Sequence, residues 1–234
     1  MSELFSIQLQ NRQQQGRDGI WLDLPTTTEQ VQAALRQIGI SSDNPQGLFI
    51  SGYFAEEEKR FAIPYNMVLA SNVDELNFLA SRLETLSTGE RAELNAALQA
   101  PQSELFSIGR ITDFPENVDY YVHLPDVHGP AQLGDYYLNR SGMVDMPEEW
   151  KGGIDTAQFG RYVAQQEQGA FTQYGYLVKS GDEWQKVHEG QPVPEEYRVL
   201  SFPAPEVLRD SANIPPPVQP ETEPQKVIPI ILNG

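Results

Sequence analysis

The chain contains no cysteine among its 234 residues. This absence excludes disulfide bonds, thiolate nucleophiles and zinc sites built on cysteine. Proteins without disulfides are typical of a reducing compartment, so we expect a cytoplasmic protein. No stretch approaches the roughly 18 consecutive apolar residues of a membrane-spanning helix, and the first ten residues lack the basic and apolar segments of a signal peptide. We therefore expect no membrane association.

Basic residues are scarce, with 16 Lys and Arg against 33 Asp and Glu, and the net charge is −17. Such a charge repels the phosphates of nucleic acids and attracts proteins built to hold those phosphates. The chain is nevertheless 39% hydrophobic and 10% aromatic, which is enough to form a core, unlike a disordered acidic tail. We expect a folded acidic protein that binds no nucleic acid directly and whose self-repulsion favours an elongated shape.

Motifs of catalysis are also missing, because the sequence has no phosphate-binding glycine loop, no nucleophile elbow and no paired histidines on a helix. The strongest candidate for a metal site is His123, Asp126 and His128, three possible ligands within six residues. No fourth ligand lies nearby, so an ordinary loop is the simpler interpretation. We expect neither an enzyme nor a cofactor, and a metal-dependent enzyme centred on these three residues is the alternative.

Periodicity in the first half of the chain predicts two small modules. Residues 1–65 form an α/β module with strands at 4–9, 19–22 and 48–53, and with a helix that begins at a capping box of Thr26 and Glu29. Residues 66–112 form a helical module. Its two main helices begin at capping boxes, Asn72 with Glu75 and Ser87 with Glu90.

The second half predicts a third module and an extension. Residues 113–190 contain a strand at 118–124, a helix at 133–139, two further helix starts and a hairpin of 174–179 with 184–187. Residues 191–234 are rich in proline and form an extended segment, with a possible strand at Val227–Leu232. The predicted fold class is α+β, as an elongated chain of three small modules (α/β, helical, α/β) with a proline-rich C-terminal extension.

Negative charge is concentrated in the 43 residues from position 113 to position 155, a window with net charge −7. Its nine carboxylates are Asp113, Glu116, Asp119, Asp126, Asp135, Asp145, Glu148, Glu149 and Asp155. Three of them are in helix-capping positions: Asp145 with Glu148 ahead of one helix, and Asp155 with Gln158 ahead of the next. The other six are predicted to be available for a partner.

Several motifs together resemble the ArdA antirestriction family over roughly residues 4 to 180. Early matches are Gly19, Trp21 and Pro25, the segment Asp74-Glu75-Leu76-Asn77, and Leu133-Gly134-Asp135-Tyr136-Tyr137. The strongest match begins at Met146-Pro147-Glu148-Glu149 and continues through Ile154-Asp155, Phe159-Gly160-Arg161, Gly169-Ala170-Phe171 and Gly175-Tyr176. This stretch is similar to the antirestriction motif of the family. Its site residues are Pro147, Ile154, Asp155, Phe159, Gly160 and Arg161.

The resemblance implies an elongated homodimer whose carboxylates imitate the phosphates of B-form DNA. It also implies a partner, the methyltransferase core of a type I restriction-modification enzyme or another DNA-binding defence protein. We interpret Phe159, Gly160 and Arg161 as structural residues: a buried ring, a close approach, and an internal ion pair or dimer contact. An alternative that fits the same charge is an acidic inhibitor of another nucleic-acid-binding protein, such as a CRISPR effector or a nucleoid protein.

Overall fold

The computed structural model describes residues 4–14, 18–56 and 61–205. Contacts divide the chain into two units, Met1–Ala204 and Pro205–Gly234, and the first is described below. It contains both helices and small antiparallel sheets, which confirms the predicted α+β class. The division into three modules stays a prediction, and the possible strand at Val227–Leu232 lies outside the described residues.

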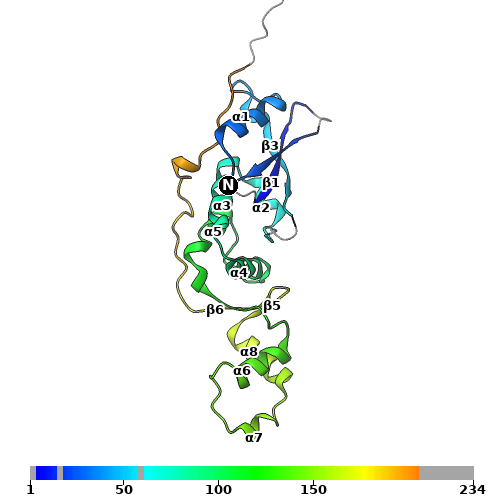
Figure 1. Ribbon diagram of the computed structural model, residues 1–234, viewed down its shortest axis with the longest axis vertical. Helices are drawn as coiled ribbons and strands as arrows, with labels where there is room; N and C mark the ends of the chain where they lie inside the picture. The colour runs from blue at the N-terminus through cyan, green and yellow to red at the C-terminus, as the bar shows by residue number, and fades with distance from the viewer. Residues whose placement is uncertain (1–3, 15–17, 57–60, 206–234) are drawn as a thin grey trace, which may run out of the picture. The chain divides into compact units, whose positions relative to one another are not determined.

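The first sheet is antiparallel with the order β2-β1-β3 (Figure 1). Its strands are β1 (Phe5–Asn11), β2 (Ile20–Leu24) and β3 (Leu48–Phe54), close to the predicted ranges. Alternate residues of β1, namely Phe5, Ile7 and Leu9, are fully buried, because one face of the sheet lies on the hydrophobic core.

Helix α1 (Thr28–Gln37) begins one position later than predicted. The capping box consists of Thr27 and Gln30, since Thr26 is buried and its backbone N–H donates to the side chain of Asn77 at 2.7 Å. Gly39 has a φ of +68° just after the helix, in the left-handed region that glycine tolerates best.

The helical region follows with α2 (Tyr65–Ala70), α3 (Val73–Glu84), α4 (Thr88–Gln99) and α5 (Ile108–Thr112). The predicted capping boxes of α3 and α4 are confirmed, each with both reciprocal hydrogen bonds. The apolar stripe of α3 is buried where the helix contacts β2 and α5. None of the helices in the described part of the chain is long and apolar enough to cross a membrane.

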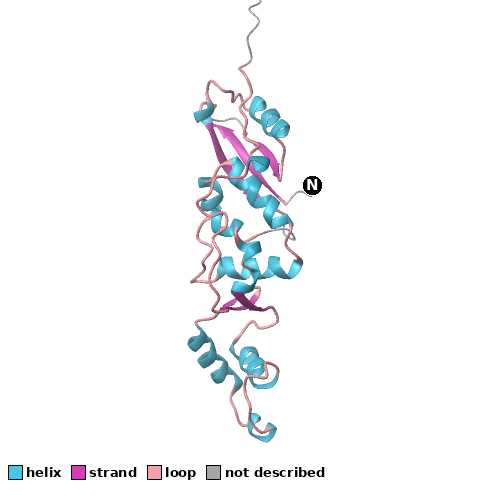
Figure 2. Cartoon of the chain, turned by 90° about the vertical axis from the view of Figure 1, so that its left-hand side faces the viewer, coloured by secondary structure: helices cyan, strands magenta, loops and turns pink. Residues whose placement is uncertain are grey.

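A second, smaller antiparallel sheet has the order β4-β6-β5 and lies between α4 and the α6–α8 pair (Figure 2). Its strands are β4 (Tyr121–Leu124), β5 (Ala170–Thr172) and β6 (Gly175–Lys179). The predicted strand at 118–124 is shorter, because residues 118–120 form a 3-10 turn, η4. The predicted pairing with 184–187 is wrong. Strand β6 pairs with β4 and β5, and Gln185 instead binds the side chain of Asn117.

Three helices complete the acidic region: α6 (Pro130–Asn139), α7 (Glu148–Lys151) and α8 (Thr156–Glu167). Asp155 caps α8 as predicted, accepting from the N–H of Gln158 at 2.9 Å. The cap predicted for Asp145 is wrong, because α7 begins after Pro147 without a side-chain cap. Helices α6 and α8 share a small core of Val127, Leu133, Val163 and Tyr176, separate from the main core.

Residues 180–204, here called the C-terminal strap, lie along the first unit (Figure 1). The backbone N–H groups of Val199 and Leu200 both donate to the same carboxylate oxygen of Asp74, each at 2.7 Å. Asn77 donates to the carbonyl of Tyr197, and the ring of Tyr197 packs on Phe78 with centroids 4.7 Å apart. The described part of the predicted extension is therefore packed against α3.

Candidate functional site

Asp113, the first residue of the acidic window, is fully buried at 0% exposure. It ends α5, and its two carboxylate oxygens accept from the backbone N–H groups of His188 at 2.6 Å and Glu189 at 3.2 Å. The prediction that this acid is available for a partner is wrong, because its charge is used to hold the C-terminal strap. Sequence patterns gave no signal of a hydrogen-bond partner 75 positions away.

Three other acids of the window have cationic partners. Glu116 pairs with Arg82 of α3, which contradicts its assignment to the available group. Asp135 pairs with Arg140 at 3.2 Å, and Glu148 pairs with Lys151 at 2.6 Å. The Glu148 side chain remains 81% exposed, so water screens that pair and its carboxylate still faces solvent.

Four acids of the window are exposed and make no hydrogen bond or ion pair with another residue of the described part. These free acids are Asp119, Asp126, Asp145 and Glu149. Asp155 is also exposed, but it caps α8. Three acids that were predicted to be available are therefore not free, namely Asp113, Glu116 and Asp135. Asp145, which was predicted to be a helix cap, is free.

Several positive side chains are held by acids within the first unit. Arg110 is buried, donates to Glu104 at 2.9 Å and Glu189 at 3.1 Å, and lies over the ring of Phe106. Lys179 donates to Glu104 at 2.7 Å, and this hydrogen bond lowers the pKa of Glu104. Since these cations are neutralised internally, the free acids carry charge that nothing on the described surface offsets by pairing.

Helices α6 and α8 approach each other through glycine. A Cβ atom on Gly160 would lie 2.7 Å from the backbone nitrogen of Gly134, and a Cβ atom on Gly134 would overlap the carbonyl oxygen of Thr156. Real Cβ atoms do not approach backbone this closely. The predicted close approach at Gly160 is therefore present, and the backbone it meets belongs to Pro130 and to Gly134, another residue of the family resemblance.

The other motif residues have varied positions. Phe159 is half-buried against the small core, and Ile154 is half-buried. Pro147 is exposed at the start of α7. Arg161 is exposed and forms no ion pair with any residue that the structure describes, so the predicted internal ion pair is not found. Its role as a dimer contact stays a prediction.

A partly buried network that the sequence did not reveal joins three elements. Glu167 at the end of α8 accepts from the hydroxyls of Tyr137 in α6 and Tyr176 in β6, the latter at 3.0 Å. Burial and the nearby Glu167 carboxylate raise the pKa of both tyrosines, which keeps them protonated as donors. Gly169 makes room for this network, because a Cβ there would overlap the Tyr176 hydroxyl.

The candidate metal ligands do not come together. His123 contacts the carbonyl of Tyr174 through Nε2 at 2.7 Å, while Asp126 and His128 are exposed. Across the described residues, no group of three His, Asp or Glu side chains could hold a metal ion. The alternative of a metal centre at these residues is therefore wrong.

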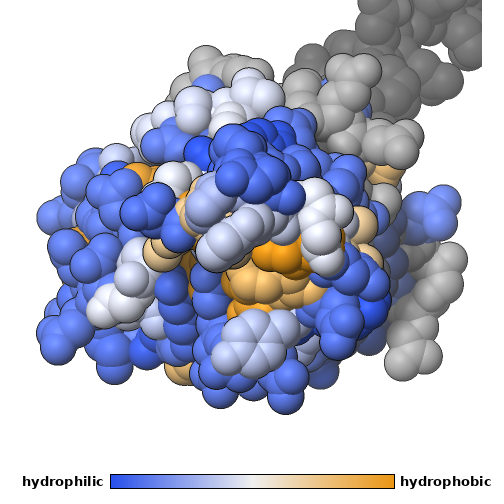
Figure 3. Space-filling model, turned by 90° about the horizontal axis from the view of Figure 1, so that it is seen from below, coloured by the Kyte–Doolittle hydropathy of each residue, from blue (hydrophilic) through white to orange (hydrophobic). Residues whose placement is uncertain are grey.

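Apolar side chains are exposed near α7 and α8. Met143, Trp150 and Tyr162 are 74%, 66% and 60% exposed. The face seen from the α7 end has an apolar hollow bordered by hydrophilic residues (Figure 3). Exposed apolar surface of this kind is typical of protein–protein contacts.

Unpaired carboxylates and exposed aromatic side chains on a packed α+β fold place the chain among folded acidic proteins. The profile of the family described as antirestriction protein (ArdA) matches residues 15–178, well over half of the chain. The chain belongs to this family, which confirms the resemblance and makes its function antirestriction. The family consists of inhibitors that target restriction-modification enzymes. No curated protein matches the sequence.

Proposed function

We propose that the protein is a DNA mimic that occupies the DNA-binding groove of a type I restriction-modification enzyme, in its methyltransferase core. By excluding DNA from that groove in the cytoplasm, it protects incoming DNA of a mobile element. The observation that supports this mechanism is the division of the acids into two sets. Acids such as Asp113, Glu116 and Glu104 hold the fold together, while Asp119, Asp126, Asp145 and Glu149 face solvent unpaired.

The electrostatics of DNA recognition favour this mechanism. Duplex DNA carries about one negative charge per 1.7 Å of axis, and proteins that bind it have basic grooves matched to that array. Phosphate contacts position a protein without specifying sequence, so carboxylates held at suitable places are sufficient for competition. A packed scaffold loses less conformational entropy on binding than a disordered acidic tail does.

We also propose that the protein acts as a homodimer. Trp150 of α7 and Tyr162 of α8 are exposed, and the unpaired Arg161 is adjacent to Tyr162 on the same helix. Burial of such a surface between two copies would remove apolar area from water. Sedimentation equilibrium should give twice the monomer mass, and Tyr162→Glu should shift the equilibrium towards monomer.

A competition titration tests the mechanism. A fluorescent duplex is bound to a type I methyltransferase, and the protein is added at several salt concentrations. The expected result is displacement of the duplex with an affinity that falls as salt rises, because the contacts are ionic. Absence of displacement at low salt would overturn the proposed target. Displacement of the same duplex from a nucleoid protein but not from the methyltransferase would favour the alternative class of partner.

A further inference from the structure

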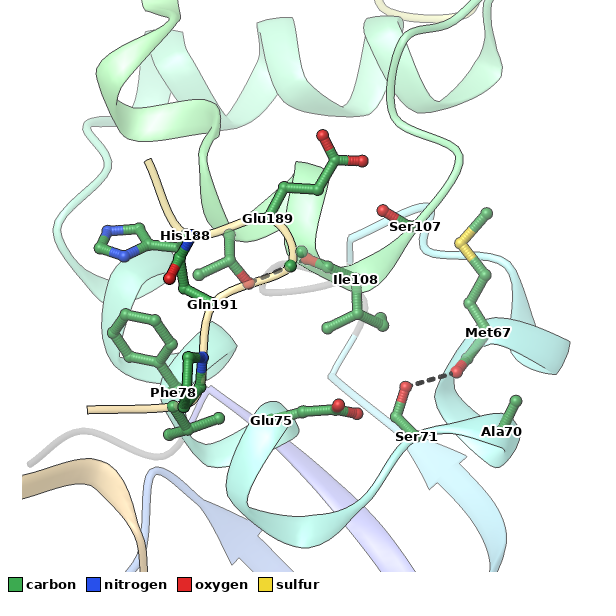
Figure 4. A pocket seen from close by; sticks show the side chains of 15 residues that line it. Met67, Ala70, Ser71, Glu75, Phe78, Ser107, Ile108, His188, Glu189 and Gln191 are labelled. Carbon is green, nitrogen blue, oxygen red and sulfur yellow. Dashed lines mark hydrogen bonds between the residues drawn. The ribbon is translucent and has the colours of Figure 1, made fainter. Parts of the chain in front are cut away.

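A cavity of about 600 Å³ opens between α2, α3, the start of α5 and the C-terminal strap (Figure 4). Its walls are mainly apolar, and the principal apolar side chains are those of Met67, Phe78, Ile108, Pro192 and Val193. The wall formed by residues 188–193 lies beyond residue 178, where the family match ends. The cavity therefore depends on a segment outside the matched region.

One carboxylate gives the cavity its charge. Glu75 accepts from the N–H of Asn72 through Oε2 at 3.2 Å, and no hydrogen bond from the described residues reaches its Oε1. The second acid of the lining, Glu189, is neutralised by Arg110 and turns away from Glu75 (Figure 4). No lysine or arginine is among the described residues that line the cavity. The site is thus an apolar cleft with a carboxylate at one side that no lysine or arginine of the described lining pairs.

One hydroxyl group adds an acceptor near this carboxylate. Ser71 donates its own proton to the carbonyl of Met67 at 2.8 Å, which leaves its oxygen lone pairs available. The Ser71 side chain lies beside Glu75 in Figure 4. A ligand that fits must therefore offer an apolar stem and a cationic end with several N–H donors.

We propose that the cavity binds an arginine side chain of the DNA-binding partner. The aliphatic stem would lie against Met67, Phe78 and Ile108, and the guanidinium would donate to Glu75 and Ser71. Arginine suits this site because its stem packs on apolar surface while its weakly hydrated, planar head carries five donors. Arginine is also the side chain that most often reads guanine edges in the major groove, so the cavity takes a residue that DNA itself would engage.

The identity of the partner rests on the proposed function, whereas the cavity can be tested without that partner. In a ¹H–¹⁵N titration of the full chain, N-acetyl-L-arginine amide should shift the amide signals of Ser71, Gly109 and Gly190. N-acetyl-L-citrulline amide has the same shape without the charge and should cause much smaller shifts. Equal shifts with both compounds, or shifts with neither, would overturn the proposal.

A charge-neutral substitution with a matched control sharpens this test. Glu75→Gln keeps the capping box, since glutamine accepts the same hydrogen bond, and should weaken arginine binding about fivefold by removing the charged acceptor. Glu90→Gln makes the same change at the equivalent position of α4 and should leave binding unchanged. A second variant, Ala70→Phe, places a ring at the exposed end of α2 in the cavity lining and should block binding without disturbing the core.

The same variants connect the cavity to the target. In competition against a DNA-bound methyltransferase, Glu75→Gln and Ala70→Phe should each inhibit less well than Glu90→Gln. If the unmodified protein displaces DNA and all three variants match it, the arginine site is wrong while the proposed function stands. If the unmodified protein displaces no DNA, the proposed function fails, and the arginine titration alone decides whether the cavity binds a guanidinium.

Discussion

Gly134 of α6 and Gly160 of α8 face each other with no side chain between them. Each glycine lacks room for a Cβ atom, and the two backbones are in direct contact. Helix pairs usually have interaxial distances of about 8–10 Å that depend on the side chains at the contact, so a glycine pair permits the closest packing. The contact joins both halves of the small core and fixes the ends of the segment that carries Asp145 and Glu149.

Replacing Gly160 with alanine should separate these helices. The added methyl group would overlap backbone that cannot move aside, so we expect a loss of about 2–4 kcal/mol in the free energy of unfolding. Urea denaturation measures the change. Gly89→Ala is the control, because Gly89 also lies in a helix but has open space around it and should gain up to about 1 kcal/mol. Equal stability of both variants would contradict the close packing.

Replacing Asp113 with asparagine should loosen the C-terminal strap without changing the acidic surface. An amide offers one acceptor oxygen where two N–H groups need acceptors, so we expect a loss of about 2–3 kcal/mol and faster hydrogen exchange at His188 and Glu189. Asp119→Asn removes the same charge at an exposed position and should change stability by less than about 0.5 kcal/mol. Slow exchange at both amides in Asp113→Asn would contradict the anchoring role.

Neutralising the free acids together should weaken inhibition more than an equal loss of charge elsewhere. The combination Asp119→Asn, Asp126→Asn, Asp145→Asn and Glu149→Gln should reduce affinity for the methyltransferase about tenfold at moderate salt, because direct ionic contacts are lost. Neutralising Asp18, Asp43, Glu183 and Glu195, which are also exposed, provides a variant of identical net charge. Equal loss in both variants, measured by competition titration, would show that total charge sets the affinity.

Glu93 should make the protein less stable as pH rises. Burial, with Glu90 and Asp119 nearby, raises the pKa of Glu93 from 4.5 to about 8. The folded state therefore holds a proton that the unfolded state has released, and stability falls between pH 4.5 and about 8. Because the side chain is partly exposed, we expect Glu93→Gln to gain only about 1 kcal/mol relative to the unmodified protein over this range. Denaturation at several pH values measures this gain, and Glu149→Gln should show none.

Local signals predicted the parts of the fold that depend on neighbouring residues. The capping boxes at Asn72 and Ser87 fixed the starts of α3 and α4, because donor and acceptor are three positions apart. The capping box of α1 lies one residue after the predicted position, because Asn77, 51 positions away, binds the backbone of Thr26. Short-range patterns cannot contain such a contact.

The same limit explains the errors at the candidate site. Asp113 and Glu116 had the sequence context of surface acids, but their partners lie 75 and 34 positions away. The network around Glu167 also needs Tyr137, 30 positions distant. The sequence therefore does not distinguish the hydrogen-bonded carboxylate of Glu167 from one that is solvated. The close packing at Gly160 is predictable from the sequence, because a glycine inside a helix leaves room for a neighbouring backbone.

The strap has a consequence for the order of events during synthesis. Asp74 and Asp113 leave the ribosome long before the N–H groups that bind them, which are 125 and 75 residues further along. Until then, both carboxylates must remain hydrated, and the groove that later receives residues 188–200 is exposed to other chains. Helix α3 can form early, but the packing around it is completed only when almost the whole of the first unit has been translated. If translation stalls before residue 199, the chain on the ribosome therefore exposes the acidic surface around Asp74 that the strap covers in the complete first unit.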